Sequence, residues 1–374
     1  MNAQRKTRTA WLRAGAIVAI ALLAASAAQA QVPPEIAAQL RQIGTGVCVP
    51  ETAKIYRPLQ PKAPYPGVTV VRDIPYAQDA RTIMDVFAPE KGGGSRPVLV
   101  YVSGGGGDKI VSGPDGDAFY DNIMLWAVKN GMTGVNMQRR GGLGGGGLAW
   151  DEPARDVGLV VDWIRKNITK YKGNPNRIFL WADSAGNGPV STYAAHPEIH
   201  GENGAAVKGI VLMSSPNFNI LPETAPAPGQ GGRGGANAAA GPGGFGNCGR
   251  PPAEAGAGGA GRGGGRGAGG APPAGGGGRG GAAATPADPA TQLTRSNLTG
   301  LAIGKIAVFL GWGELDPPNI ITFDEALKNA LCKTGRCPTT AFFKDHSHVS
   351  LVFSPNTADN SVTGPILKWM KSVK

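Results

Sequence analysis

Ser184 has the sequence surroundings of a nucleophile. It stands at the end of an apolar run within Arg177–Asn187, and small residues, Ala182 and Gly186, lie two places to either side of it. A helix-compatible segment follows, so the predicted context is a strand, a tight turn and a helix, in which the serine hydroxyl projects from the strand end. The backbone N–H of Ala185 then points to the place where an oxyanion forms during acyl transfer. The same spacing also occurs in ordinary turns, so the prediction depends on later residues.

A nucleophilic serine needs a base within hydrogen-bond reach, and the sequence has four histidines. His196 and His200 follow the serine closely, on or just after the helix that leaves the turn, so we expect them at the surface, pointing away from the hydroxyl. His346 and His348 follow a later strand, where a loop can return an imidazole over the sheet edge. We predict that His348 is the base, with His346 as the rival; a pair of solvent-exposed loop histidines is the other interpretation.

The base needs an acid that fixes its tautomer and stabilises its positive charge. Asp316 comes after the predicted strand Ile306–Leu310, in a turn-rich stretch. The chain order of serine, aspartate and histidine is one that hydrolases with a nucleophile on a sharp turn use. Glu314 and Asp345 are the rivals, and a plain turn aspartate before two prolines would look the same.

A glycine run follows the third predicted strand, at Ser103–Gly107. Consecutive glycines let backbone N–H groups approach an oxyanion with no Cβ in the way, and we predict that Gly105 and Gly106 donate to it together with Ala185. A phosphate-binding loop is the competing interpretation. It fails because neither a Gly-Lys-Ser/Thr ending nor GxGxxG spacing is present.

A second glycine run, Arg139–Gly147, is expected to border the same pocket. Its two arginines, Arg139 and Arg140, are open to two interpretations. They can attract an anionic substrate, or they can simply be solvated.

Strand and helix signals alternate along the chain, which predicts an α/β fold with a mostly parallel sheet covered by helices on both faces. Most of the predicted strands are continuous apolar runs, as expected for strands buried on both sides. The two opening strands alternate apolar and polar residues, as half-exposed strands do. The predicted strands are 68–71, 82–87, 97–102, 133–137, the run before Ser184, 209–213, 306–310 and 340–343; the predicted helices are 118–128, a helix beginning near Asp151 and Pro153 and ended by 173–176, and 364–372.

Several of these motifs together resemble a known fold. The sequence resembles the α/β-hydrolase fold, and within it the carboxylesterase/lipase group with the HGGG oxyanion motif, at Ser103–Gly106, Ala182–Gly186, Gly313–Asp316 and His346–His348. It also resembles that group's opening strand at Met84–Pro89 and its helix before the nucleophile at Asp151–Asp156. The resemblance runs from about residue 68 to the C-terminus, apart from a low-complexity insert. It implies that Ser184 is the nucleophile, Asp316 the acid and His348 the base of a serine esterase.

Three positions depart from that group's pattern. Ser103 stands where the motif has histidine, Ala182 replaces the first glycine of the nucleophile turn, and Gln138–Arg140 replaces Tyr-Arg-Leu. Alanine is small enough for the turn, and loss of the histidine removes no backbone donor. We expect these changes to affect rate and substrate more than the type of reaction.

The first thirty residues predict a signal peptide. Four basic residues and no acidic one accompany the apolar segment Ala14–Ala25, and Ala28–Ala30 offers a small-residue cleavage site. We expect cleavage after Ala30 and a periplasmic or secreted protein. The apolar segment is shorter than the roughly 20 residues of a membrane span, so we expect no stable span after cleavage; an uncleaved N-terminal anchor is the alternative. Cleavage lowers the formal net charge from +11 to +7, with no block of like charges left, so the basicity indicates no nucleic-acid partner.

Residues 223–291 are dominated by Gly, Ala and Pro. Such a segment buries too little apolar area to offset its ordering entropy, so we expect disorder. Its position between two core strands, on the side of the predicted site, is one where a lid can lie, but we interpret it as filler. The predicted organisation is a signal peptide (1–30), an N-terminal extension (31–67), the first part of the α/β domain (68–222), the insert (223–291) and the second part of the domain (292–374).

The chain has four cysteines, and thiols of exported proteins tend to pair. A disulfide can close the short loop from Cys332 to Cys337, which leaves Cys48 with Cys248. Three connectivities are possible, and the sequence does not choose among them. No pair has CxxC spacing, so no zinc or redox site is predicted.

These features together predict an exported serine hydrolase that cleaves small-molecule carboxylic esters through an acyl-enzyme, without a metal or organic cofactor. One alternative is a non-catalytic or weakly active binding protein that keeps the fold. Another is a peptidase or amidase that uses the same triad. The oligomeric state is not predicted.

Overall fold

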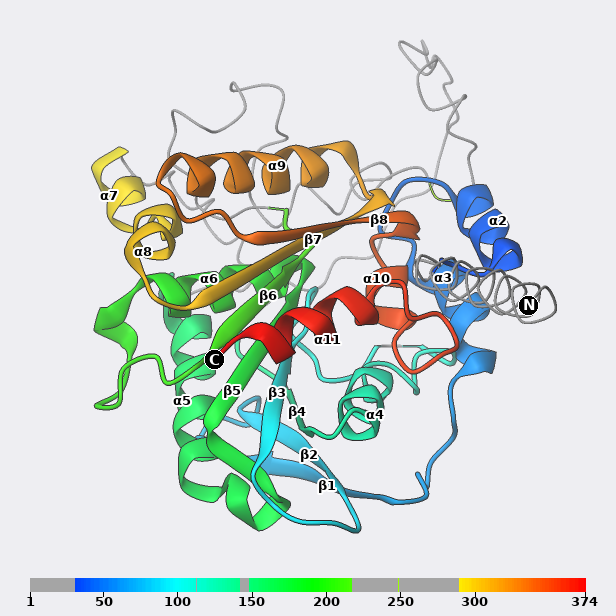
Figure 1. The fold of residues 1–374 in the computed structure, drawn as a ribbon, viewed down its shortest axis with the longest axis horizontal. Helices are drawn as coiled ribbons and strands as arrows, with labels where there is room; N and C mark the ends of the chain where they lie inside the picture. Colours follow the sequence, from blue (N-terminus) through cyan, green and yellow to red (C-terminus); the bar gives the residue numbers. More distant parts are fainter. Residues whose placement is uncertain (1–30, 112, 142–147, 217–247, 249–288) are drawn as a thin grey trace, which may run out of the picture.

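The computed structural model describes residues 31–111, 113–141, 148–216, 248 and 289–374. The predicted signal peptide, most of the insert and the glycines of 142–147 therefore lie outside the described residues. Within them, eight strands form one sheet in the order β1-β2-β4-β3-β5-β6-β7-β8 (Figure 1). The strands are β1 (Val68–Pro75), β2 (Ile83–Pro89), β3 (Arg96–Val102), β4 (Thr133–Met137), β5 (Gly173–Asp183), β6 (Gly209–Met213), β7 (Ala307–Leu315) and β8 (Thr339–Ser347).

The sheet is parallel except at its beginning. β2 pairs antiparallel with both β1 and β4, whereas the strands from β4 across to β8 are all parallel to their neighbours. The carboxyl ends of β3, β5, β6, β7 and β8 therefore meet at one edge of the sheet. That edge is where ligands bind in sheets of this kind.

Helices cover both faces of the sheet. The helices are α2 (Pro34–Ile43), α3 (Val49–Tyr56), α4 (Asp121–Lys129), α5 (Glu152–Asn167), α6 (Asn187–Ala195), α7 (Pro289–Thr294), α8 (Asn297–Ile303), α9 (Pro318–Lys333), α10 (Ser350–Phe353) and α11 (Thr363–Ser372), with short 3-10 segments η1 (Arg57–Leu59), η2 (Ile168–Tyr171), η3 (Ser184–Gly186) and η4 (Pro197–Ile199). In Figure 1, α11 crosses in front of the strands and α5 lies behind β5. None of the helices in the described part of the chain is long and apolar enough to span a membrane.

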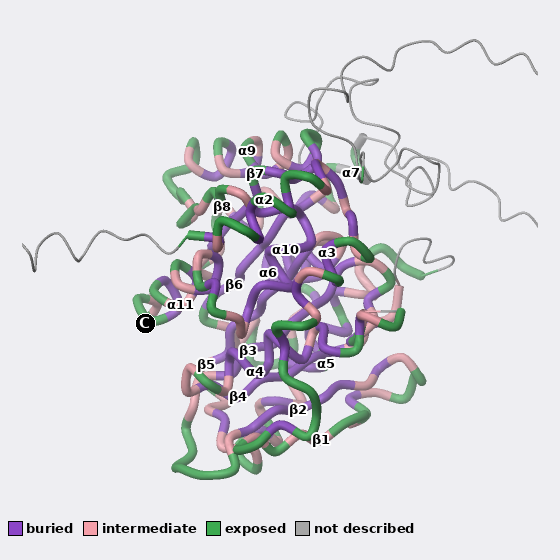
Figure 2. The backbone as a smooth tube through the Cα atoms, turned by 90° about the vertical axis from the view of Figure 1, so that its right-hand side faces the viewer, coloured by how far each residue is buried: buried purple, intermediate pink, exposed green. Residues whose placement is uncertain are grey.

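Two hydrophobic cores lie on the two faces of the sheet. Successive side chains of a strand point to opposite faces, and β5 feeds both cores: Phe179 and Trp181 enter one, whereas Leu180 and Ala182 enter the other. The first core also contains residues of α2, α3, α4 and α11, and the second contains residues of α5, α6 and α9. Burial is concentrated on the central strands, as the purple segments of Figure 2 show. The fold class predicted from the alternation of strands and helices is confirmed.

The structure corrects three local predictions. β2 is not half exposed, because it lies inside the sheet between β1 and β4 and its five central residues are buried. Residues 173–176, predicted to end the preceding helix and lead into the strand, are themselves part of β5, where Gly173 pairs with Arg96 of β3, and that helix, α5, already ends at Asn167. β8 extends to Ser347, because its pairing with β7 resumes at Leu315.

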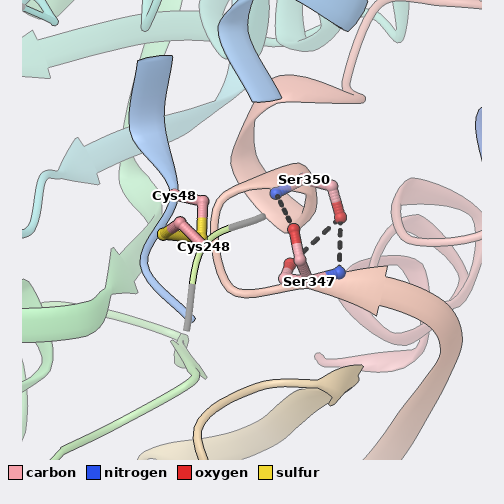
Figure 3. The surroundings of a disulfide bond; sticks show 4 residues. All are labelled: Cys48, Cys248, Ser347 and Ser350. Carbon is pink, nitrogen blue, oxygen red and sulfur yellow. Dashed lines mark hydrogen bonds between the residues drawn. A yellow bond between two sulfur atoms is a disulfide. The ribbon is translucent and has the colours of Figure 1, made fainter. Parts of the chain in front are cut away.

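The cysteines pair as Cys48–Cys248 and Cys332–Cys337. Cys48 immediately precedes α3, and Cys248 is the one described residue within 217–288. Figure 3 shows this disulfide beside the turn that contains Ser347 and Ser350. The bond therefore joins the N-terminal extension to the insert next to the turn that carries His348.

Candidate active site

Ser184 occupies a sharp turn between β5 and α6. It has φ 51°, in the left-handed region that non-glycine residues rarely adopt, and it begins the single 3-10 turn η3. A Cβ on Gly186 would lie 2.2 Å from the carbonyl oxygen of Val102, so the chain after Ser184 can approach the end of β3 only with glycine there. The predicted strand, tight turn and helix around Ser184 are thus present.

Alanine fits at position 182 because that residue is still in the strand. Ala182 pairs with Val102 on one side and Leu212 on the other, and its side chain lies in the core. The tight backbone approach occurs after the serine, at Gly186, where the sequence keeps glycine.

The loop after β3 lies directly against the serine. A Cβ on Gly104 would lie 2.7 Å from Cβ and 3.3 Å from Oγ of Ser184, so a larger residue has no room. Gly105 (φ 51°) faces open space on its side-chain side. The sequence prediction named Gly105 and Gly106 as donors but missed Gly104, the residue whose contact sets how close this loop comes to Ser184.

His348 and Asp316 are brought together at the ends of β8 and β7. Nδ1 of His348 lies 2.8 Å from Oδ1 of Asp316, and both side chains are buried. The second carboxylate oxygen of Asp316 accepts hydrogen bonds from the Ser214 hydroxyl at 2.6 Å and the Gly313 N–H at 2.7 Å. These bonds fix the carboxylate, which in turn fixes the imidazole. Ser214, at the end of β6, carried no signal in the sequence because serines are common after strands.

The other nitrogen of His348 is left without a partner. Nε2 is buried and has no hydrogen bond to any described residue. Burial lowers the pKa of His348, but the hydrogen bond and charge of Asp316, together with the charge of Asp183, outweigh it, so the pKa is raised overall. An imidazole held through Nδ1, with Nε2 unpaired, is arranged to take a proton from a group placed before it.

The imidazole of His346 contacts a different set of residues from that of His348. Its Nδ1 lies 2.9 Å from the Ser350 hydroxyl, and its Nε2 lies 2.7 Å from the Ser361 hydroxyl and 3.4 Å from a carboxylate oxygen of Asp359. Burial lowers its pKa to about 4, against the opposing charge of Asp359. Both nitrogens have partners inside the protein, so His346 supports the turn and is not aimed at Ser184.

The rival acids lie away from His348. A carboxylate oxygen of Glu314 accepts from the backbone N–H of Asp345 at 2.9 Å, and Asp345 forms an ion pair with Arg41. Glu314 is exposed. Of the carboxylates considered from the sequence, Asp316 is the one that contacts His348.

The surface position expected for His196 is wrong. His196 is buried, with Nδ1 2.7 Å from Glu198 and its ring edge-on to Trp150. His200 is half-buried and its Nε2 lies 2.6 Å from the Tyr193 carbonyl oxygen. Both lie beyond the far end of α6, a helix of about 13 Å counted from the turn, so they remain away from Ser184 as expected.

Neither interpretation of the two arginines after β4 is correct. Arg139 is 3% exposed, and Arg140 forms ion pairs with Glu152 and with the buried Asp156. Neither guanidinium is free for an anionic substrate, and neither is simply solvated. Sequence alone gave no sign of this, because the partners of Arg140 lie on α5 and those of Arg139 are backbone carbonyls.

Asp183 is a further residue that sequence reasoning missed. It precedes Ser184, is buried, and one of its carboxylate oxygens has no partner among the described residues. Burial raises its pKa to about 7, and the charge of His348 opposes that rise. This interaction places His348 within electrostatic reach of the turn that carries the serine.

The described residues contain no group of three or more His, Cys, Asp or Glu side chains able to hold a metal ion. The chemistry available at this edge of the sheet is that of a hydroxyl, an imidazole, carboxylates and backbone N–H groups. Such a set suits acyl transfer through a covalent intermediate.

Residues 82–222 match the carboxylesterase family. Curated relatives include Phenmedipham hydrolase of Pseudarthrobacter oxydans, 30% identical over 46% of this chain and 34% of that protein. Secreted lipase 5 of Gibberella zeae is 32% identical over 34% of this chain and 28% of that protein. The match thus spans about a third of the length of these relatives. The resemblance predicted from the motifs is confirmed.

Solved structures show the fold. Esterase B from Lactobacillus rhamnosis superimposes with a TM-score of 0.59 at 14% identity, over 87% of this chain and 93% of that one. A truncated carbohydrate esterase from gut microbiota gives a TM-score of 0.54 at 14% identity, over 83% of this chain and 98% of that one. With the sheet order above, these likenesses establish that the chain has the α/β-hydrolase fold.

Proposed function

We propose that this chain, an α/β-hydrolase whose residues 82–222 match the carboxylesterase family, hydrolyses carboxylic esters through an acyl-enzyme. One observation carries the proposal: His348 is held on Asp316 through Nδ1, whereas its buried Nε2 has no partner among the described residues. A buried polar atom without a partner costs free energy. The cost of leaving Nε2 unpaired is explained if this nitrogen receives the proton of Ser184 during the reaction.

In the proposed reaction, Ser184 attacks the ester carbonyl carbon while Nε2 of His348 takes the hydroxyl proton. Asp316 keeps the imidazole in the required tautomer and stabilises its positive charge. The carbonyl oxygen becomes an oxyanion, for which the backbone N–H groups of Gly105, Gly106 and Ala185 are the proposed donors.

Collapse of the tetrahedral intermediate breaks the bond to the alcohol, which leaves with the proton from His348. Water then attacks the acyl-enzyme with the same imidazole as base, and the carboxylic acid departs as Ser184 recovers its proton. The left-handed backbone of Ser184 supports this role, since strain of that kind concentrates at functional positions.

Export is part of the proposal. It is supported by the signal-like sequence of residues 1–30 and by the two disulfides, which persist in oxidising compartments. We propose cleavage after Ala30 and a periplasmic or secreted enzyme. The mass and N-terminal sequence of the protein recovered from its native host test this directly.

A fluorophosphonate probe tests the nucleophile. It should label the wild-type protein and leave Ser184→Ala unlabelled. The same pair of proteins is then assayed on p-nitrophenyl esters of short and long acyl chains and on matched anilides. Equal labelling of both proteins would exclude Ser184 as the nucleophile. Labelling with no ester turnover would favour a binding protein, and faster turnover of the anilides would favour an amidase.

A further inference from the structure

Arg139 is a buried cation that donates hydrogen bonds to both ends of the loop beside the nucleophile, Ser103–Gly107, and to Gly141 in its own loop. Its Nη2 donates to the Ser103 carbonyl oxygen at 3.2 Å, and its Nη1 donates to the Gly141 carbonyl oxygen at 2.5 Å. Its backbone N–H donates to the Gly107 carbonyl oxygen at 3.0 Å. The side chain also packs on the same loop, because a Cβ on Gly107 would lie 2.7 Å from Cγ of Arg139.

Arg139 forms no ion pair with any described residue, unlike its neighbour. Arg140 is paired with Glu152 and Asp156. Burial lowers the pKa of Arg139 to about 10, and the nearby charge of Arg81 acts in the same direction, so the guanidinium still carries its charge at neutral pH. A buried charge without a direct counter-ion is costly. Arg139 is therefore poorly explained as a device for stability alone.

The side chains of Arg81 and Ser103 hold the same loop. Arg81 donates to the Gly106 carbonyl oxygen at 3.0 Å and to a carboxylate oxygen of Asp108 at 2.9 Å, and its Nε donates to the Arg139 carbonyl oxygen at 3.1 Å. The Ser103 hydroxyl donates to the Asp108 carbonyl oxygen at 2.6 Å and closes the base of the loop. Three carbonyl groups of the loop, those of Ser103, Gly106 and Gly107, thus accept hydrogen bonds from Arg139 or Arg81.

We propose that Arg139, assisted by Arg81, is a positioning residue that holds the loop Ser103–Gly107 at the distance from Ser184 at which its N–H groups can bind an oxyanion. Because the two arginines bind carbonyl oxygens of the loop, they fix the orientation of its peptide planes. The N–H groups of Gly105 and Gly106 donate to no other described residue. Arg139 thus binds Ser103, the residue that stands where the esterase motif has a histidine.

This inference rests on the proposed function in one respect: the loop matters to catalysis only if Ser184 forms an oxyanion intermediate. If it does, loosening the loop raises the energy of the transition state and leaves the ground-state ester almost untouched. The loss then falls on kcat and not on KM.

Arg139→Met keeps much of the side-chain volume and removes the guanidinium. We expect kcat on a short p-nitrophenyl ester to fall about 100-fold, with KM changed less than about threefold, since loss of one oxyanion donor costs a factor of that size. Arg139→Lys keeps the positive charge but not the planar guanidinium with its several N–H donors, and its kcat should fall about tenfold. Arg140→Met is the matched control; it loses two ion pairs and should show lower thermal stability without a comparable loss of kcat.

A trifluoromethyl ketone provides a readout that a structural defect would not move. It adds to the serine as a hemiketal oxyanion, so its Ki should rise in Arg139→Met by the factor by which kcat/KM falls. A kcat within threefold of wild type, or an unchanged Ki, would overturn the positioning role. If Arg139→Met does not fold, Arg139→Lys and the more exposed Arg81→Met, with an expected loss of about tenfold, carry the same test.

Amide hydrogen exchange separates this inference from the proposed function. Peptides covering 103–109 should exchange faster in Arg139→Met than in wild type or Arg140→Met, whether or not the protein hydrolyses esters. If exchange is faster in Arg139→Met and the wild type has no esterase activity, the proposed function is contradicted and the positioning role is supported. Unchanged exchange would contradict the positioning role even in an active esterase.

Discussion

Two histidines, two residues apart at the end of β8, occupy opposite chemical settings. His346 is the last but one residue of the strand and has hydrogen-bonding partners at both ring nitrogens. His348 lies just beyond the strand, is held at Nδ1 by Asp316, and has no partner at Nε2 among the described residues. Both rings are buried, so exposure does not distinguish them.

The pKa values of the two histidines are shifted in opposite directions. Burial lowers the pKa of His346 to about 4, because Asp359 compensates only in part. At His348 burial acts in the same direction, but Asp316 and Asp183 more than compensate and raise the pKa. A neutral imidazole with both nitrogens bonded stabilises the fold. An imidazole whose cationic form is favoured and whose second nitrogen is unpaired can accept a proton during a reaction.

The comparison indicates how to recognise a functional group in a buried polar cluster. An unpaired buried polar atom costs about 1–3 kcal/mol, and proteins satisfy most such atoms. Among the described residues the exceptions include a ring nitrogen of His348, a carboxylate oxygen of Asp183 and Nε of Arg139. The following experiments separate the two roles.

Removal of His348 should give the largest effect. We expect His348→Ala to lower kcat on esters by about 10⁴-fold. Its free energy of unfolding should change by about 1 kcal/mol or less, because Asp316 keeps its bonds from Ser214 and Gly313. Steady-state kinetics and urea unfolding measure the two quantities. In the same assays His346→Asn should keep kcat within about tenfold of wild type; similar losses in both variants would abolish the distinction.

Removal of His346 should affect stability first. His346→Ala leaves the buried hydroxyl of Ser350 and the half-buried hydroxyl of Ser361 without their imidazole partner. We expect a loss of about 2–3 kcal/mol in the free energy of unfolding, measured by urea denaturation. His200→Ala is the control, since that half-buried ring has one bond, to Tyr193, and should cost about 1 kcal/mol. A smaller loss at His346 than at His200 would contradict the structural role.

Acid should destabilise the wild type through His346. Its pKa is depressed in the folded state to about 4 from an ordinary value of 6.5, so the unfolded chain binds the proton more readily between these values. The contribution of His346 is therefore present above pH 6.5 and is lost as the pH falls towards 4, by about 3 kcal/mol in total.

The measurement is the difference in unfolding free energy between wild type and His346→Asn, taken at several pH values from 4 to 7. The subtraction matters because Asp183, with its pKa raised to about 7, acts in the opposite sense. Its contribution is present at low pH and lost as the pH rises through 7. A difference that does not shrink on acidification would show that His346 is not held neutral.

Much of the fold could be predicted because each element has local signals. The apolar run before Ser184 is a buried strand, and β4 and β6 have the predicted bounds. β2 was predicted too exposed because its burial depends on the position of β1, which is fixed only in the assembled sheet. The helices of 31–67 were not predicted, since their apolar residues find partners on β8 and α10.

The candidate site likewise contains residues that could be predicted from the sequence and contacts that could not. Ser184, Asp316 and His348 could be proposed because each follows a strand whose carboxyl end meets the others at one edge of the sheet. The supporting contacts could not be proposed. Arg139 binds backbone carbonyls, which no residue pattern encodes, and Ser214, just after β6, reaches Asp316, just after the neighbouring strand β7. The difference between His346 and His348 likewise depends on the residues that fold around each ring.

Asp183 should give the smallest measurable effect, and it tests the electrostatic side of the comparison. Its carboxylate raises the pKa of His348, and His348 must be neutral to act as a base, so activity rises as the pH passes through that pKa. Asp183→Asn removes a negative charge and should move the acid limb of kcat/KM to lower pH. We expect a shift of less than about one pH unit, because burial raises the pKa of Asp183 to about 7 and its charge is therefore incomplete near neutral pH.

The shape of the limb is as informative as its position. Since the charges of Asp183 and His348 each shift the pKa of the other group, the limb should be broader than that of a single proton and should sharpen in Asp183→Asn. Glu314→Gln, which removes an exposed carboxylate two residues from Asp316, is the control and should leave the profile in place. An acid limb that does not move in Asp183→Asn, or that moves to higher pH, would mean that this carboxylate does not raise the pKa of the imidazole, and the contrast with His346 would then depend on Asp316 alone.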